Sequence, residues 1–298
     1  MVLNTMGGER ELQKSHISFV GITGSGKTHA LTLLAITGEE LQKKGLVNIL
    51  YNEKSVFGRE PLPIREYTYR LRMGEVLEPT PLEKKVLSCE IILRFPGLLF
   101  EKTIHIMPID IAGELLRVVM ELIPDVKTIR DLIKKIQEKT GMTLSEEDVQ
   151  IIRNHILSAH GYILVFDAPR LVSQESVAME QAVGLARFME ELRVFRREAG
   201  VKEPLRGVAI LLTKVDQLIG IRIESGKDVE NFVETYAPAI KSELEEARRN
   251  GAKIGFFYSR LNVFHDDRGK GRVYVTGRTP VYSREQYERL IFWIKDTF

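Results

Sequence analysis

Eight consecutive residues near the amino end limit the folds open to this chain: Gly21-Ile22-Thr23-Gly24-Ser25-Gly26-Lys27-Thr28. They fit the pattern G-x-x-x-x-G-K-[ST], whose glycines let backbone N–H groups turn inward onto phosphate oxygens. A short apolar run ends at Val20, and a helical pattern runs from Thr28 to Lys44. Strand, loop and helix in this order predict a P-loop that binds a nucleoside triphosphate, with Lys27 on the phosphates and the Thr28 hydroxyl on Mg²⁺.

A glycine-rich turn with a surface lysine is the alternative, and the flanking strand and helix count against it. The motif alone does not distinguish ATP from GTP. The predicted nucleotide contacts in and beside the loop are Gly21, Thr23, Gly24, Ser25, Gly26, Lys27, Thr28 and His29.

The charge of the chain does not favour a nucleic-acid partner. The 43 basic and 41 acidic residues are interspersed and give a formal net charge of +2. The single cysteine, Cys89, cannot form an internal disulfide, so we expect a reducing compartment. Residues 1–14 lack the apolar core of a signal peptide, and no apolar stretch reaches the roughly 18 residues of a membrane span. We therefore expect a cytoplasmic protein.

Strand and helix patterns alternate from Gly161 onward, which predicts a parallel sheet covered by helices on both faces. Earlier in the chain, two β-rich runs flank Pro96-Gly97 and predict an antiparallel pair. The predicted fold is therefore α/β, with a mostly parallel sheet and one antiparallel strand. The expected strands are 18–20, 47–51, 88–95, 100–109, 162–166, 208–212 and 253–258, and the expected helices include 67–73, 173–197, 227–249 (a second helix starting at Pro238) and one after Ser283.

The length of 298 residues exceeds that of an ordinary domain of roughly 100 to 150 residues. We interpret residues 1–298 as a single domain with two insertions. The first covers about 45–87, and the second, about 115–160, has a wholly helical pattern. Residues 261–282, with the turn His265-Asp266-Asp267-Arg268-Gly269, are expected to form a surface hairpin.

Asp110 follows the predicted strand 104–109 and should emerge at the carboxyl edge of the sheet, where ligands bind. An aspartate there can hold Mg²⁺ through a water, and the backbone N–H of Gly113 is suited to contact a γ-phosphate. The alternative is that Asp110 only caps the following helix. Pro108 conflicts with a central strand, because proline removes a ladder donor.

Thr213-Lys214-Val215-Asp216 follows the predicted strand 208–212 at the same edge of the sheet. The Asp216 carboxylate can accept hydrogen bonds from N1–H and N2–H₂ of guanine, a donor pair that adenine lacks. The stem of Lys214 can lie across the base, and Thr213 can tie the segment to the P-loop. Four residues alone are a weak signal, but their position and order strengthen it.

Gly21–Thr28, Asp110–Gly113 and Thr213–Asp216, in this order and each at a strand end, resemble the guanine-nucleotide motifs of P-loop GTPases. The Pro96-Gly97 hairpin resembles the Ras-like and translation-factor class. Leu71-Arg72-Met73-Gly74-Glu75 followed by Glu78-Pro79-Thr80-Pro81 is similar to prokaryotic small GTPases of the double-GTPase type. The resemblance implies a Ras-like G domain that binds GTP or GDP with Mg²⁺.

The resemblance also implies individual roles. Thr80 would be the switch I threonine that completes the Mg²⁺ and γ-phosphate contacts, with Thr68 as a weaker candidate and a plain turn residue as the alternative. Ser259 and Arg260, after the strand 253–258, would contact the base. The metal ligands would then be Thr28, Thr80 and Asp110, and the catalytic residues would be Lys27, Thr80, Gly113 and Glu114.

Two residues depart from the Ras-like pattern. Glu114 stands where such proteins usually have a glutamine that orients the attacking water, and its charge would lie near the γ-phosphate. Thr23 replaces a glycine and adds bulk where a partner's arginine would approach. We therefore expect slow hydrolysis that a protein partner stimulates, and the sequence assigns no arginine within the chain to that role.

Three functions remain open at this point: a GTP-hydrolysing switch, a nucleotide-dependent assembly module with little turnover, and a P-loop ATPase. Protein partners and a homodimer are both compatible with the helical insertion. His155 and His160 have a poor spacing for a metal site on one helix face, and His265, Asp266 and Asp267 fit a solvated turn better than a cation site.

Overall fold

The computed structural model describes residues 15–21, 24–52, 63–77, 86–88, 90–97, 101–106, 109–111, 134, 137–138, 159–198 and 205–298. The structural statements below concern these residues. Of the predicted helical insertion at 115–160, only Lys134, Gln137, Glu138, Ala159 and His160 are among them, and the first three are helical.

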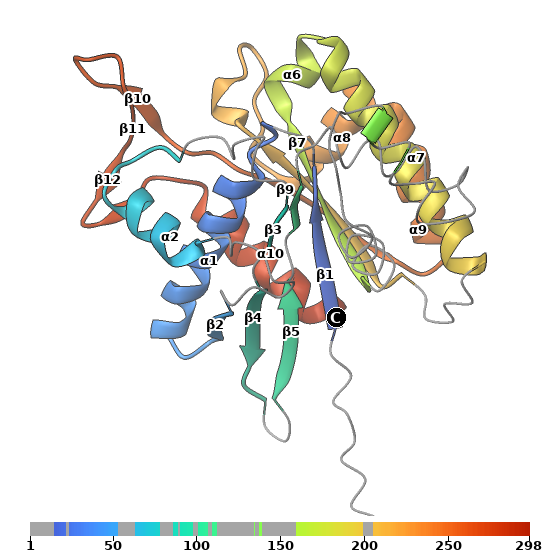
Figure 1. The fold of residues 1–298 in the computed structure, drawn as a ribbon, viewed down its shortest axis with the longest axis horizontal. Coiled ribbons are helices and arrows are strands. Elements are labelled where there is room, and N and C mark those ends of the chain that lie inside the picture. The colour runs from blue at the N-terminus through green and yellow to red at the C-terminus, as the bar shows by residue number, and fades with distance from the viewer. Residues whose placement is uncertain are drawn as a thin grey trace, which may run out of the picture.

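A seven-stranded sheet forms the centre of the molecule, in the order β2-β4-β5-β1-β7-β8-β9 (Figure 1). β4 is antiparallel to both of its neighbours, whereas β5, β1, β7, β8 and β9 are parallel to one another. The prediction of a mostly parallel sheet with one antiparallel strand is therefore confirmed. The strands are β1 (Ser15–Val20), β2 (Asn48–Asn52), β4 (Glu90–Phe95), β5 (Lys102–Ile106), β7 (Gly161–Asp167), β8 (Gly207–Thr213) and β9 (Lys253–Tyr258).

The central strands are apolar along their length because both of their faces are covered. Every residue of β7 and of β8 is buried, as expected for parallel strands between two helical layers. The carboxyl ends of β1, β7 and β8 lie at the upper edge of the sheet in Figure 1. The segments that follow these three strands are therefore close to one another.

Helices cover both faces, as the sequence predicts. One core lies under α1 (Lys27–Lys43), α2 (Ile64–Arg72) and α10 (Arg284–Thr297). A second core lies under α7 (Ser176–Glu198), α8 (Gly226–Tyr236) and α9 (Pro238–Arg249), on the opposite side of the sheet in Figure 1. The two helical layers make this an α/β fold.

The predicted start of α9 and the predicted buried face of the last helix are confirmed, and α8 has a capping box that the sequence analysis did not predict. Pro238 is the first residue of α9, a position that does not need a backbone donor. α8 begins with a capping box, in which the Ser225 hydroxyl accepts a hydrogen bond from the Asp228 N–H, and the Asp228 carboxylate accepts one from the Ser225 N–H. The apolar positions of the last helix are buried as expected: Tyr287, Leu290, Ile291, Ile294 and Phe298.

The predicted helix 173–197 is confirmed as α7, and a short helix that the sequence did not predict precedes it. α6 (Ala168–Val172) starts directly at the end of β7, and Ser173–Glu175 separate it from α7. Asp167 caps α6 by accepting a hydrogen bond from the Arg170 N–H. This additional helix is favoured by that cap, together with Pro169 near its first position.

The predicted strand 100–109 is wrong at its end. β5 stops at Ile106, two residues before Pro108, which cannot donate to a ladder. Ile109–Ile111 form a separate short strand, β6, that pairs antiparallel with β3 (Val86–Ser88) and lies against β1. Asp110 is therefore inside β6, opposite Leu87, and not at the end of a central strand.

The region predicted as the first insertion adds to the sheet. β2 extends the edge beside β4, and α2 packs against α1. The expected surface hairpin is also present as β10 (Val263–His265) and β11 (Gly271–Val273), which project from the body at the upper left of Figure 1. A second short pair follows, β12 (Val275–Thr276) and β13 (Thr279–Pro280).

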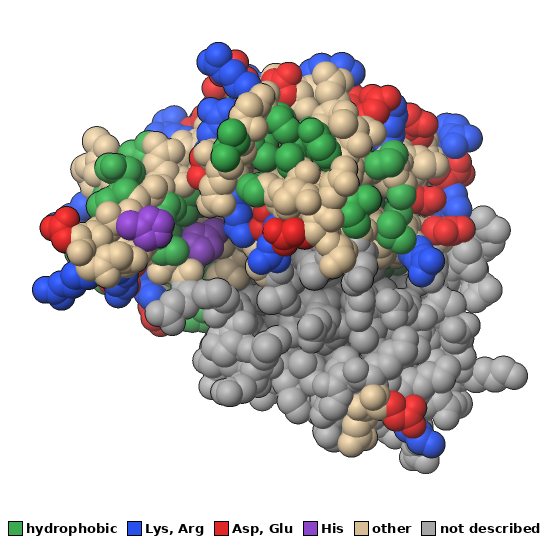
Figure 2. Space-filling model, turned by 90° about the horizontal axis from the view of Figure 1, so that it is seen from above, with side chains coloured by type: hydrophobic (Ala, Val, Ile, Leu, Met, Phe, Trp, Pro, Cys, Tyr) green, Lys and Arg blue, Asp and Glu red, His purple; other side chains and the backbone are tan. Residues whose placement is uncertain are grey.

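The surface seen from above carries basic and acidic side chains side by side on its described part (Figure 2). This mixture agrees with the interspersed charges of the sequence. Among the helices that the structure describes, none is long and apolar enough to cross a membrane.

Candidate functional site

The P-loop connects β1 to α1 at the upper edge of the sheet, as predicted. Gly24 and Gly26 have positive φ angles of 77° and 82°, which favour glycine. A Cβ atom at Gly21 would lie 2.7 Å from both Ser25 Oγ and Val165 O, so the close approach of β7 also requires glycine there. The glycines of the motif thus shape this turn.

Lys27 folds back over the loop. Its side chain is only 6% exposed, and its Nζ atom donates a hydrogen bond to Gly21 O at 2.6 Å. The side chain of Lys27, the first residue of α1, therefore spans the turn, and its ammonium group reaches Gly21, the first glycine of the motif. A glycine cradle with a buried ammonium at the amino end of a helix has the chemistry to hold a phosphate chain.

His29 links the start of α1 to the segment before the predicted switch I. Its Nε2 atom accepts a hydrogen bond from the Leu77 N–H at 3.3 Å. Burial, together with the nearby positive charge of Lys214, lowers the pKa of His29 from 6.5 to about 4. The ring is therefore neutral at physiological pH, and its Nε2 atom can accept the hydrogen bond from the Leu77 N–H.

The segment after β8 is bonded directly to the P-loop. The buried Thr213 hydroxyl lies 2.6 Å from Ser25 O and 2.9 Å from Phe166 O. Lys214 has a left-handed backbone (φ 57°), and its Nζ atom donates to Gly24 O at 2.9 Å. Two separate side chains thus fix the position of the loop relative to β8.

Asp216 lies beside the segment that follows β9. Its Oδ1 atom accepts a hydrogen bond from the Leu261 N–H at 3.4 Å. The pKa of Asp216 is raised by partial burial, and this is opposed by hydrogen bonds from backbone N–H groups and by the charge of Arg260. The two segments predicted to contact the base are therefore adjacent.

Ser259 and Arg260 are held by the last helix. Ser259 is buried and its Oγ atom accepts a hydrogen bond from the Tyr287 hydroxyl at 2.7 Å, while the Arg260 N–H donates to Ser283 Oγ. The Arg260 guanidinium lies 5.1 Å from the centre of the Tyr258 ring and bonds to Ile223 O. Both side chains are thus fixed before any ligand binds.

Asp167 and Arg170 belong to this site, and the sequence reasoning missed both. Asp167 is 1% exposed, and its Oδ2 atom lies 2.5 Å from Lys214 Nζ. The signal was present in Asp167-Ala168-Pro169-Arg170, because a capping residue and a proline after a wholly apolar strand indicate a helix start at the carboxyl edge of the sheet.

Four of the predicted site residues lie outside the described part of the chain: Thr23, Thr80, Gly113 and Glu114. For Asp110 only the backbone is described, in β6 beside β1. The Mg²⁺ contacts of Thr80 and Asp110 therefore stay predictions. The described residues contain no cluster of three metal-binding side chains, and His160 accepts a hydrogen bond from the His16 N–H through Nδ1.

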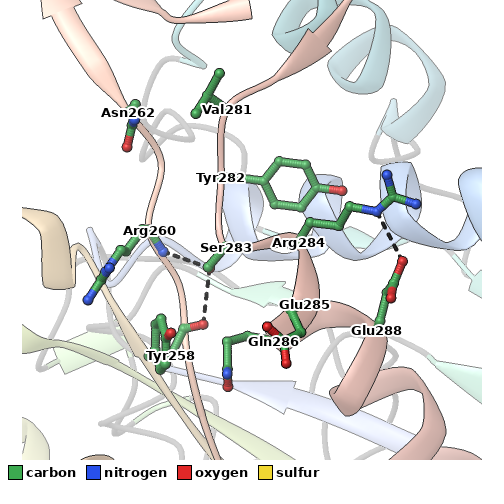
Figure 3. A pocket seen from close by; sticks show the side chains of 10 residues that line it. All are labelled: Tyr258, Arg260, Asn262, Val281, Tyr282, Ser283, Arg284, Glu285, Gln286 and Glu288. Atoms are coloured by element: carbon green, nitrogen blue, oxygen red, sulfur yellow. Dashed lines mark hydrogen bonds and ion pairs between the residues drawn. The ribbon is translucent and has the colours of Figure 1, made fainter. Parts of the chain in front are cut away.

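A cavity of about 510 Å³ opens beside the Arg260 segment, between the end of β9 and the start of α10 (Figure 3). Ser283 lies at its wall, where its hydroxyl bridges the Arg260 N–H and Tyr258 O. The cavity borders the predicted base-contacting loop. Its lining residues are Tyr258, Arg260, Asn262, Val281, Tyr282, Ser283, Arg284, Glu285, Gln286 and Glu288.

The fold and the site define an α/β protein with a P-loop at the carboxyl edge of a mostly parallel sheet. No family model matches the sequence, and no curated protein matches it. Among solved structures, this chain is similar to the signal recognition particle receptor SRb-GTP/SRX complex from Chaetomium thermophilum. The two sequences are 14% identical, the TM-score is 0.46, and the match covers 95% of this chain and 100% of that chain. At this TM-score we draw no conclusion from the likeness.

Proposed function

We propose that this chain is a guanine-nucleotide switch that binds GTP with Mg²⁺ and hydrolyses it. The observation that carries the proposal is the direct bonding of Thr213 and Lys214 to Ser25 O and Gly24 O of the P-loop. These bonds join the loop suited to phosphates to the segment that carries Asp216. A phosphate site and a guanine-reading carboxylate at one edge of the sheet support a single nucleotide site.

In this proposal the P-loop N–H groups and Lys27 hold the β- and γ-phosphates. Mg²⁺ is held by Thr28, Thr80 and Asp110, and it would supply charge neutralisation between the phosphates. Asp216 accepts the two guanine donors, and the stem of Lys214 lies along the base. Ser259 and Arg260 close the base site from the other side, where the Tyr287 hydrogen bond supports Ser259.

The switching part of the proposal concerns Thr80 and Gly113, which would bind the γ-phosphate and release it after hydrolysis. Glu114 and Thr23 alter the surroundings of the γ-phosphate, so we propose slow turnover that a protein partner accelerates. We also propose that the whole chain is one Ras-like G domain, in which the 115–160 segment is a partner-binding or dimerising insertion.

Asp216→Asn tests the base site. The variant should lose guanine affinity on the order of 10²-fold, because two hydrogen bonds to a charged group are replaced by a mismatched amide. It should gain affinity for xanthosine nucleotides, whose changed edge suits an amide. Titration of the purified protein with fluorescent GDP, ADP and xanthosine diphosphate measures this. Asp267→Asn, in the exposed hairpin turn, is the matched control.

Wild-type protein should bind GTP and GDP far better than ATP. Equal affinity for both purines, or an unchanged preference in Asp216→Asn, would contradict the guanine assignment and favour an ATPase. Phosphate release with and without cell extract separates a switch from an assembly module. Stimulation by extract supports the switch, and persistent bound nucleotide without stimulation supports the assembly module.

A further inference from the structure

Arg170 holds its guanidinium group against the tip of the P-loop. A Cβ atom placed on Gly24 would lie 3.2 Å from Arg170 Nη1, 3.4 Å from Nη2 and 3.5 Å from Cζ. These distances show that the guanidinium lies on the side of Gly24 where a side chain would project. A planar cation is therefore next to the loop that we propose holds the phosphates.

The backbone of Arg170 is fixed by the end of β7. α6 follows that strand without a loop, and Figure 1 shows it above the upper edge of the sheet. Asp167 Oδ1 accepts a hydrogen bond from the Arg170 N–H at 3.2 Å, and α6 also contacts the turn Val215–Gln217 after β8. The side chain therefore starts from a rigid position next to the loop.

The guanidinium itself is held loosely. Arg170 Nε lies 3.6 Å from Asp167 Oδ2 and 3.9 Å from Glu175 Oε2, and both distances exceed a hydrogen bond. Asp167 Oδ2 instead lies 2.5 Å from Lys214 Nζ. Within the described part of the chain, the five N–H donors of this group have no close acceptor, and the side chain is 37% exposed. Little has to be broken for the group to move onto an anion.

We propose that Arg170 is a catalytic residue that binds the oxygens of the β- and γ-phosphates of GTP, as an arginine supplied by the chain itself. This inference rests on the proposed function. A planar fork of N–H donors matches two phosphate oxygens at once, and the position of the guanidinium beside Gly24 places it next to the loop proposed to hold the phosphates. No other described arginine lies against the P-loop glycines in this way.

The chemistry explains why a cation is effective at this place. Water attacks the γ-phosphorus, the bond from that phosphorus to the β–γ bridging oxygen breaks, and GDP leaves with the electron pair. Inorganic phosphate and a proton are the other products. Negative charge increases on the leaving β-phosphate in the transition state, and a fixed cation there lowers the barrier. Arg170 would then account for hydrolysis without a partner.

The catalytic role of Arg170 is tested by single-turnover hydrolysis of GTP with the variants Arg170→Ala and Arg170→Lys, measured without any partner protein. Both variants should hydrolyse on the order of 10²-fold more slowly, which is below the 10³ to 10⁵ associated with a complete arginine finger. Their affinity for fluorescent GDP should stay within about threefold of wild type, since the contact forms mainly in the transition state. Lysine restores the charge but not the fork, so it should not rescue the rate.

A second measurement does not depend on turnover. Wild-type protein with GDP and aluminium fluoride should form a transition-state complex, detected by the fluorescence of the labelled GDP, and both Arg170 variants should not. Arg289→Ala is the matched control, because this arginine is on the surface of α10 and pairs only with Glu285 among the described residues. It should behave as wild type in every assay.

Two results would overturn the inference while leaving the proposed function intact. One is hydrolysis and complex formation at wild-type levels in Arg170→Ala. The other is a loss of GDP affinity that equals the loss of rate and that lysine repairs, because it would show that Arg170 only supports the shape of the loop. A wild-type protein that binds no guanine nucleotide would remove the proposed function and this inference together.

Discussion

The Thr213 hydroxyl shows how much of the site depends on single atoms. Thr213 is the last residue of β8, is 3% exposed and lies against Gly26. Its hydroxyl faces Ser25 O and Phe166 O. A short, branched side chain with a hydroxyl fills this space and bonds to a carbonyl there. The loop geometry is therefore set from a strand almost 190 residues away.

Thr213→Val removes this hydroxyl and nearly keeps the volume. We expect a loss of about 1 to 3 kcal/mol in the free energy of unfolding, because a buried carbonyl loses its donor. GTP and ATP affinity should fall by the same factor, since the phosphate loop and not the base contact is affected. Urea unfolding and nucleotide titration measure the two effects.

Thr235→Val is the control for that variant, because the Thr235 hydroxyl bonds to Asn231 O on the exposed face of α8. It should change stability by less than about 0.5 kcal/mol. If the Thr213→Val protein is as stable as the Thr235→Val protein, the hydrogen bond from Thr213 to the P-loop contributes nothing to the free energy of unfolding.

Individual elements are stabilised by local rules that the sequence displays. α8 has a complete capping box, in which Asp228 also accepts a hydrogen bond from the Glu224 N–H. These donors hold the pKa of the Asp228 carboxyl below its usual range. The helix lies over β9, so its position affects the loop that carries Ser259.

Ser225→Ala should reduce the free energy of unfolding by about 1 kcal/mol, the usual cost of losing an N-cap. Thermal unfolding of the variant against Ser176→Ala, an exposed serine at the start of α7, measures the difference. Equal melting temperatures for the two variants would show that the capping box does not stabilise α8.

The sequence predicted the elements wherever a single local signal decided the outcome. β9 matches its predicted bounds, and Pro238 starts α9, because strand periodicity and the proline ring each act within a few residues. The end of β5 and the whole of α6 were missed. The apolar run to Ile109 suggested a longer strand than β5, and α6 depends on the cap by Asp167, which no periodicity displays.

At the scale of the whole molecule, two partly buried histidines connect stability to pH. His29 and His16 both have their pKa lowered from 6.5 to about 4, His29 mainly by burial and then by Lys214, and His16 mainly by burial and then by His160. Between these two pH values the unfolded chain binds protons that the folded chain does not. Stability should therefore fall as the pH drops from about 6.5 towards 4.

His29→Gln tests this linkage, because the amide oxygen can still accept the hydrogen bond from Leu77. The nucleotide-free wild type should lose about 2 kcal/mol more than this variant between pH 7.5 and pH 5. Urea unfolding at both pH values gives the two losses, and His265→Gln, in the exposed hairpin, is the control. Identical losses in wild type and His29→Gln would contradict the proposed cause.

The site was predictable from the sequence only in part, for a physical reason. The P-loop and the Thr213–Asp216 segment are short motifs whose chemistry lies in consecutive residues. The contact of Arg170 with Gly24 joins residues 146 positions apart and depends on the angle at which α6 leaves β7. No periodicity records such a contact, so the arginine became visible only in three dimensions.

β1 lies between β5 and β7 in the middle of the sheet, and α1 packs against α10 at the far end of the sequence. A ribosome adding about 5 to 20 residues per second makes the glycine loop early and its supports much later. Thr213 and Lys214 follow the glycine loop by 188 and 190 residues in the chain. A nascent chain that has not yet reached β8 should therefore hold its glycine loop without these two supports, and it should need protection from aggregation during that wait.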